Sequence, residues 1–227
     1  MAGDAGMKKS RRMAFVAALW ASAAAVPAAA QSHLSPAIAA ARNGDLDALR
    51  TAIKKGADLN AVDSETGRTA LMSAAAKGYV RLVEALVAEG ADVNLEDSFG
   101  ETALLDAARE GRADVVKVLV AAKARVDAKN HDGETPLVLA VSTDCAAAVG
   151  ILASAGASVN AIDRRGWRPL MYAASRGHAG AAVALLAAGA DARATASDGD
   201  TTALSLAILR NHKNVAALLK KAMDTRK

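Results

Sequence analysis

The side chains of this chain that could act as nucleophiles, proton donors or metal ligands are few and scattered. Cys145 is the only cysteine, and His33 and His131 share no metal-ligand spacing with any other residue. The chain contains no G-x-S-x-G, H-E-x-x-H or G-x-x-x-x-G-K-[ST] motif. The segment Asp198-Gly199-Asp200 is similar to the start of a calcium loop, but the further oxygen ligands and the closing glutamate are missing. We therefore expect no enzyme activity, no metal and no cofactor.

A single cysteine leaves the chain without an internal disulfide, so the core alone must stabilise the fold. Two interpretations of the Cys145 thiol stay open from the sequence. It is either a small apolar filler of the fold, or a reactive thiol that is oxidised or bonded to another molecule.

Binding is the second kind of chemistry that these residues could perform. Four arginines surround Trp167 in the sequence, namely Arg164, Arg165, Arg168 and Arg176. This cluster favours contact with an anionic partner surface, although a solvated charged edge explains it equally well. Trp167 and Phe99 stand in turn segments with no core nearby. Each ring therefore either folds back as local packing or contacts a partner.

A regular repeat determines where these residues lie. One phrase occurs five times, as Thr69-Ala70-Leu71, Thr102-Ala103-Leu104, Thr135-Pro136-Leu137, Arg168-Pro169-Leu170 and Thr202-Ala203-Leu204. Its leucines are 33, 33, 33 and 34 residues apart. A fixed period of about 33 residues indicates supersecondary units that stack and bury their apolar faces against one another.

Residues 97–129 show how one unit is built. Gly100 can take the positive φ that a tight turn over residues 97–100 requires. Thr102 can cap a first helix over residues 103–110, and Gly111 ends that helix. A second helix is expected over residues 114–122, with one apolar face made of Val115, Val116, Leu119 and Val120. Because aromatic residues make up only 3% of the chain, alanine, leucine and valine must form the core.

This pattern closely resembles the ankyrin repeat over about residues 35–223, where the turn residues, the threonine phrase and the helix faces all agree. The resemblance implies stacked pairs of helices with hairpin fingers that project sideways. Cys145, His178 and His212 take the place of the second consensus histidine, which implies structural roles for the two histidines. Lys123 and Asp144 replace consensus glycines, where a left-handed backbone costs a non-glycine residue about 1 kcal/mol.

We therefore predict an all-α ankyrin-repeat solenoid of about six helix-turn-helix units with short β-hairpin fingers. The two outer units lack parts of the consensus and are expected to be capping repeats. The expected boundaries are 1–30 for a leader, 31–62 for the N-terminal capping repeat, 63–96, 97–129, 130–162 and 163–195 for internal repeats, and 196–227 for the C-terminal capping repeat and tail.

Proteins of the ankyrin-repeat family bind partners through the finger tips and the exposed side of each first helix. By position, the resemblance implies partner contacts at Phe99, Glu101, Arg109, His131, Asp132, Arg164, Arg165, Trp167, Tyr172 and Arg176. The same mapping places Arg68 and Asp106 on this surface. Tryptophan, tyrosine and arginine are the residues that most often dominate binding energy at interfaces.

The first thirty residues predict a secretory signal peptide. The basic segment Lys8-Lys9-Ser10-Arg11-Arg12 precedes an apolar run from Met13 to Val26. Small residues at Ala28 and Ala30 fit a signal-peptidase site, so cleavage is expected after Ala30. An apolar run of about 14 residues is too short to cross a bilayer of roughly 30 Å as a helix. We therefore expect no stable membrane insertion after cleavage.

The net charge of +4 comes mostly from this leader. The leader holds four of the 28 basic residues and one of the 24 acidic residues, which leaves 24 basic against 23 acidic residues and a net charge of +1. A nearly neutral body gives no electrostatic basis for binding nucleic acid.

Together these observations predict a non-catalytic scaffold or adaptor of the bacterial exported type, a monomer that binds another protein in the periplasm. Two alternatives belong to other functional classes. One is an effector secreted onward toward a host. The other is an envelope protein, which could support oxidative-stress defence, because exported ankyrin-repeat proteins have been linked to peroxide tolerance and catalase.

Overall fold

The computed structural model describes residues 35–225, so the expected leader and residues 31–34 lie outside the described residues. Within this range the chain forms twelve helices and no β-strand. The helices are α2 (Pro36–Asn43), α3 (Leu46–Lys54), α4 (Ala70–Lys77), α5 (Val80–Ala88), α6 (Ala103–Arg109), α7 (Ala113–Ala121), α8 (Pro136–Ser142), α9 (Ala146–Ser154), α10 (Pro169–Arg176), α11 (Ala179–Ala187), α12 (Ala203–Leu209) and α13 (Lys213–Thr225).

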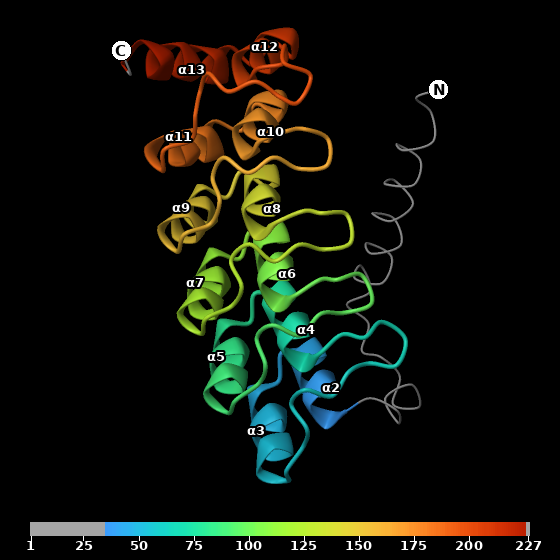
Figure 1. The fold of residues 1–227 in the computed structure, drawn as a ribbon. Coiled ribbons are helices and arrows are strands. Elements are labelled where there is room, and N and C mark those ends of the chain that lie inside the picture. Colours follow the sequence, from blue (N-terminus) through green and yellow to red (C-terminus); the bar gives the residue numbers. More distant parts are fainter. Residues whose placement is uncertain (1–34, 226–227) are drawn as a thin grey trace. The chain divides into compact units, whose positions relative to one another are not determined.

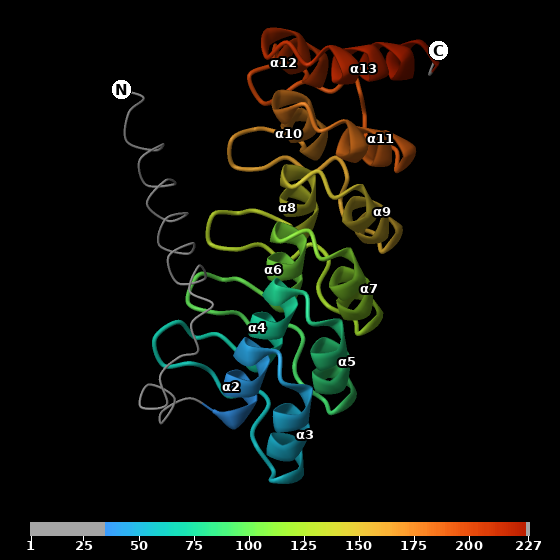
Figure 2. The same ribbon diagram turned by 180° about the vertical axis from the view of Figure 1, so that it is seen from behind.

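The helices form six pairs that stack in two columns (Figures 1 and 2). The even-numbered helices, α2 to α12, are the first helices of the pairs. Each contacts the next along one column. The second helices, α3 to α13 in odd numbers, do the same along the other column. Each pair therefore contacts only its neighbours, and the predicted all-α repeat solenoid is confirmed.

Threonine caps explain where most of the first helices begin. The hydroxyl oxygens of Thr69, Thr102, Thr135 and Thr202 each accept a hydrogen bond from the backbone N–H three residues later, at 3.0 to 3.4 Å. Each bond satisfies an N–H group that has no partner inside its helix. In α10 the cap position is Arg168, which makes no such bond, and Pro169 follows as the first helical residue.

The apolar positions of the repeat form the core. Leu71, Leu104, Leu137 and Leu170 are all buried, as is the face of α7 made by Val115, Val116 and Leu119. Alanines such as Ala74 and Ala107 fill the space between neighbouring first helices and are also buried. These small side chains let the helix backbones approach closely, which suits the low aromatic content of the chain.

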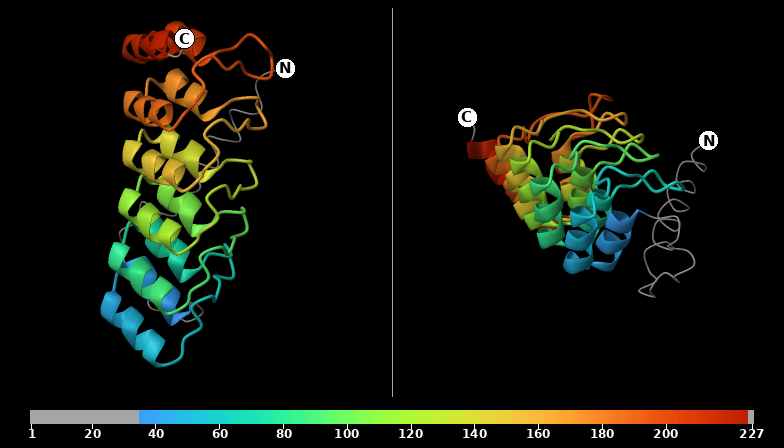
Figure 3. Two further views of the ribbon diagram at one scale, coloured as in Figure 1. Left: turned by 60° about the vertical axis from the view of Figure 1, so that its left-hand side comes forward. Right: turned by 90° about the horizontal axis from the view of Figure 1, so that it is seen from below.

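The connections between repeats form fingers on one side of the two columns (Figure 3). In the finger that precedes α6, Asp97 N–H donates to Glu101 O at 2.9 Å, and Gly100 N–H donates to Asp97 O at 2.9 Å. The expected β-hairpins are reduced to such turns. Among residues 35–225 the single β-bridge joins Thr195 and Thr202. The other fingers of residues 35–225 close through hydrogen bonds at the tip, such as those of Asp97 and Gly100, without a strand ladder.

Candidate protein-interaction surface

A polar side chain fixes the shape of four fingers, namely those that begin at Asp63, Asp97, Asn130 and Asp163. Asp97 Oδ1 accepts hydrogen bonds from the backbone N–H groups of Phe99 and Glu101, at 2.8 and 3.0 Å. Asp163 Oδ1 does the same for Arg165 and Trp167, at 2.9 and 2.8 Å. These bonds hold the tip in one conformation, so the side chains that it carries are presented in fixed positions.

Neighbouring fingers are also joined to one another. His131 N–H donates to Phe99 O at 3.0 Å, and the guanidinium of Arg164 donates to His131 O at 3.1 Å. Ser197 N–H donates to Gly166 O at 3.1 Å. The fingers from residue 97 to residue 201 are thus linked side by side, and their tips make one continuous surface.

An aromatic pair lies where the fourth internal repeat meets this surface. The ring centroids of Trp167 and Tyr172 are 5.2 Å apart, with an interplanar angle of 63°, an edge-to-face arrangement. The hydroxyl of Tyr172 donates to Asp163 Oδ2. Burial and this hydrogen bond raise the pKa of Tyr172. Both rings are only half-buried, so the Trp167 ring packs locally against Tyr172 and also reaches solvent.

The arginines around this pair make no ion pairs within residues 35–225. Arg164 and Arg176 donate to the carbonyl oxygens of His131 and Ser142, at 3.1 and 2.9 Å. Arg168 donates to Asn160 O at 2.6 Å. Carbonyl groups thus orient Arg164, Arg168 and Arg176, and no carboxylate of the described residues lies within ion-pair distance of these guanidinium groups. We call Arg164, Arg165, Trp167, Tyr172 and Arg176 the basic-aromatic patch.

The preceding two repeats carry a different, mostly acidic arrangement. Arg109 pairs with Glu101 and lies 3.5 Å from Glu134, and Asn130 Nδ2 donates to both carboxylates, at 2.9 and 3.1 Å. The side chain of Glu101 is only 14% exposed, and its Oε2 is buried without a hydrogen-bond partner. Burial raises the pKa of Glu101 from 4.5 to about 7, although Arg109 lowers it. Glu101 is thus a member of a buried network, where we expected a partner contact.

The remaining expected contact residues lie at finger tips. Phe99 is 42% exposed, and His131 and Asp132 are exposed on the next finger. The His131 ring lies over Gly100, where an added Cβ would come within 2.8 Å of it. Phe99, His131 and Asp132 are thus exposed on two neighbouring fingers, whereas Glu101 and Arg109 pair with each other.

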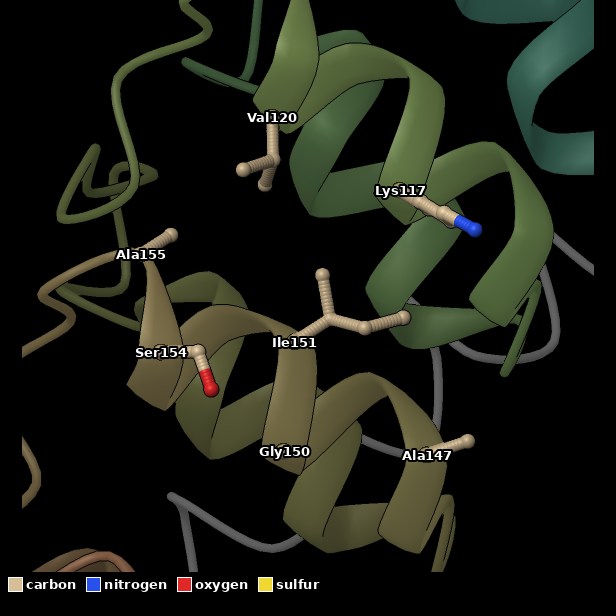
Figure 4. A pocket seen from close by; sticks show the side chains of 7 residues that line it. All are labelled: Lys117, Val120, Ala147, Gly150, Ile151, Ser154 and Ala155. Atoms are coloured by element: carbon tan, nitrogen blue, oxygen red, sulfur yellow. The ribbon is translucent and has the colours of Figure 1, made fainter.

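One hollow of the described residues can be compared with a catalytic site. It has a volume of about 530 Å³ and is a shallow depression between α7 and α9 on the second-helix side (Figure 4). Apolar side chains such as Val120 and Ile151 line it, and the ammonium group of Lys117 points away from its centre. Reactive groups do not converge there. In the described part of the chain no three potential ligands among His, Cys, Asp and Glu cluster as a metal site would require.

Cys145 and the histidines of the inter-helix turns hold repeats together. His178 Nδ1 lies 2.8 Å from Val141 O, and His212 Nε2 lies 3.2 Å from Ser175 O, so each ring bonds to the preceding repeat. The Sγ atom of Cys145 lies 3.5 Å from Gly111 O. The structural interpretation of the two histidines is confirmed. Cys145 is half-buried, so it is neither a fully buried filler nor a fully exposed thiol.

Comparison with known proteins decides the family. The family model described as ankyrin repeats (3 copies) matches residues 19–97 and 74–163, and the model for ankyrin repeats (many copies) matches residues 152–207. The chain belongs to the ankyrin-repeat family. A stretch of 72 residues is 39% identical to the Ankyrin repeat and KH domain-containing protein mask of Drosophila melanogaster. That stretch is 31% of this chain and spans 2% of the relative, so the likeness concerns the repeats alone.

A buried ion pair of this ankyrin-repeat protein was not predicted from the sequence. Asp106 and Arg68, expected on the surface, are largely buried, and Arg68 Nη2 lies 2.5 Å from Asp106 Oδ2. A comparison of the repeats with one another contains an indication that Asp106 is buried. The position of Asp106 is held by the buried Leu139 and Leu206 in two other repeats, and by the half-buried Tyr172 in α10. A carboxylate that is buried at this position needs a cation beside it.

Proposed function

We propose that this ankyrin-repeat protein is a non-catalytic scaffold that binds another protein through its fingers and first helices. The main support for this proposal is the basic-aromatic patch. A half-buried Trp167 packs edge-to-face on Tyr172, and the guanidinium groups beside it have no carboxylate partner within residues 35–225. Aromatic rings and arginines held in one conformation bind at little cost in conformational entropy.

The charge of the patch defines the chemistry of the partner. In the first half of the stack, Arg42, Arg68 and Arg109 are all neutralised by carboxylates of the same chain. In the second half, Arg164, Arg165 and Arg176 form no ion pair with a carboxylate of residues 35–225. A partner that presents an acidic surface beside an apolar group would supply the missing charges, and the electrostatic attraction would speed its association.

Photo-crosslinking tests this proposal. A photoreactive amino acid at Arg165 in the patch is expected to capture a partner from the native compartment. The same amino acid at Lys117, on the second-helix side, is the matched control. Capture from position 165 that disappears when Trp167→Ala is added supports the patch. Equal capture from both positions would contradict it.

We also propose that the protein acts in the periplasm after cleavage behind Ala30. The support is the order of charges and apolar residues in the leader, with small residues at Ala28 and Ala30. Among the helices of residues 35–225, none combines the length and the apolar character needed to cross a membrane. N-terminal sequencing of the protein from a periplasmic fraction should find Gln31 first. An uncleaved chain in the cytoplasmic fraction would contradict this localisation.

A further inference from the structure

The last helix pair leaves an apolar surface uncovered. On α12, Ile208 is 58% exposed and Leu209 is 76% exposed, and Leu204 is half-buried. Helix α12, which carries these three residues, lies at the C-terminal end of the described stack and contacts α10 and α13 (Figure 1). We call Leu204, Ile208 and Leu209, with the neighbouring part of α13, the terminal face.

The repeats themselves show that this surface is normally an interface. The residues at the position of Ile208 in the four preceding repeats are Ala75, Ala108, Val141 and Ala174, and each is 0% exposed. Each belongs to a first helix that is packed between two other first helices, whereas α12 has such a neighbour on one side only in residues 35–225. Ile208 therefore occupies a helix-packing position, with a larger side chain than the alanines at three of its four equivalents. Leu204 takes the place of Leu71, Leu104, Leu137 and Leu170, which are all buried. Leu209 takes the place of Ala76, Arg109, Ser142 and Ser175, and it extends the apolar surface beside Ile208.

The shape and charge around the terminal face restrict what could cover it. A shallow hollow of about 310 Å³ lies between α12 and α13, with a floor of alanine methyl groups and Ile208. Lys213 and Lys220 line the hollow, and Arg210 follows Leu209. None of these three cations forms an ion pair within residues 35–225. A second copy of the chain would bring two such basic rims together, which like-charge repulsion opposes.

We propose that the terminal face binds an amphipathic helix of a partner protein, whose apolar stripe is flanked by acidic residues. The apolar stripe covers Ile208 as the next first helix covers its equivalents in the other repeats, and it extends over the adjoining Leu209. The acidic residues pair with Arg210, Lys213 and Lys220. This site is separate from the basic-aromatic patch, and a partner could occupy it alone or together with the patch.

Two synthetic peptides of about 18 residues, five helical turns, test the proposal. Both carry the same leucine stripe at helical spacing, and the stripe is flanked by glutamates in one peptide and by lysines in the other. Each is titrated into the isotope-labelled protein while backbone amide signals are recorded. The glutamate peptide is expected to shift the signals of α12 and α13 saturably, and to bind at least about tenfold more tightly than the lysine peptide.

Two variants separate the terminal face from the patch. Ile208→Lys combined with Leu209→Lys is expected to abolish binding of the glutamate peptide, with the amide signals of α2 to α10 unchanged as evidence of folding. Arg164→Ala combined with Arg165→Ala should leave this binding intact, so a defective patch and a defective terminal face give different results.

Several results would overturn the proposal. They are the absence of glutamate-peptide binding, equal binding of both peptides, and shifts confined to α3 to α9. Reversible self-association in sedimentation experiments, removed by Ile208→Lys, would assign the terminal face to a second copy instead.

Discussion

The guanidinium of Arg68 and the carboxylate of Asp106 lie 2.5 Å apart across the boundary between two repeats. Arg68 also lies 3.2 Å from Asp97, so one cation compensates two buried carboxylates. Its pKa is raised, because the attraction of these carboxylates outweighs its burial. A buried ion pair contributes little compared with an apolar replacement of both partners, but the loss of one partner is costly.

Replacement of Arg68 by methionine is therefore expected to lower the free energy of unfolding by about 3–5 kcal/mol. The double variant Arg68→Met, Asp106→Leu should recover a large part of this loss, because leucine occupies the same position in two other repeats. Denaturant unfolding measures both values. Arg50→Met, which breaks an exposed pair with Asp47, is the control and should cost less than about 1 kcal/mol. Additive losses in the double variant would contradict a coupled pair.

Glu101 makes stability depend on pH near neutrality. Its pKa is about 7 in the folded chain and near 4.5 when exposed, so the folded state binds more protons between these values. The contribution of Glu101 to stability is therefore complete below about pH 4.5 and is lost as the pH rises to about 7. A shift of this size corresponds to roughly 3 kcal/mol. The charged groups that face Glu101 are Arg109 and Asp106 of α6, Glu134 and Asp97 of the fingers, and Arg68.

Glu101→Gln should remove most of this decline, since glutamine does not titrate in this range. Unfolding free energies measured from pH 5 to pH 8 in wild type and variant provide the comparison. Asn130 and Arg109 can still bond to the amide oxygen at position 101, so the variant should remain folded. An identical pH dependence in the two proteins would show that Glu101 has an ordinary pKa.

Replacement by glycine is expected to have different effects on stability at two residues with a left-handed backbone. Lys123 has φ 67° and Asp144 has φ 53°, both at positions where other repeats carry glycine. Lys123→Gly should stabilise the protein by about 0.5–1 kcal/mol, because it relieves backbone strain. Asp144→Gly should bring no gain, because Asp144 Oδ1 accepts a 2.8 Å hydrogen bond from Ala181 N–H at the start of α11. Thermal unfolding measures both changes in stability. Equal gains in stability from the two variants would show that the hydrogen bond between Asp144 and Ala181 does not stabilise the fold.

A truncation in the core should cost far more than one on the surface. Leu119 is completely buried on α7, so Leu119→Ala is expected to lower the free energy of unfolding by about 2–5 kcal/mol. Leu209→Ala makes the same chemical change at a residue that is 76% exposed and should cost less than about 1 kcal/mol. Trp167→Ala should lie between them, because its ring is half-buried against Tyr172. Equal losses from all three would contradict the assignment of the core.

The fold was predictable because the same pattern of residues recurs along the chain. Five copies of one phrase place the threonine caps, the buried leucines and the turn glycines, and these local rules determine the helices. Even the left-handed Lys123 and Asp144 followed from glycines at the same places in other repeats. The prediction of β-hairpin fingers was not met in residues 35–225. There the fingers close by turns, without strand ladders.

The site was less predictable, since it depends on contacts between repeats. Sequence position placed Trp167 and Tyr172 on one surface, but it could not show that the rings touch or that Asp163 bonds to the hydroxyl of Tyr172. Glu101 and Arg109 were expected to face a partner, yet they pair with each other. Pairing of charges over 29 or 38 residues of sequence is determined only by the stack, as for Arg68 with Asp97 and Asp106.

Amide hydrogen exchange of the protein, alone and with the partner captured at position 165, tests the central claim most directly. Binding through the fingers and first helices predicts new protection at residues 97–101, 130–134 and 163–176. The second helices α5, α7 and α9 should keep their exchange rates. Protection confined to those second helices, with the fingers unchanged, would contradict the account.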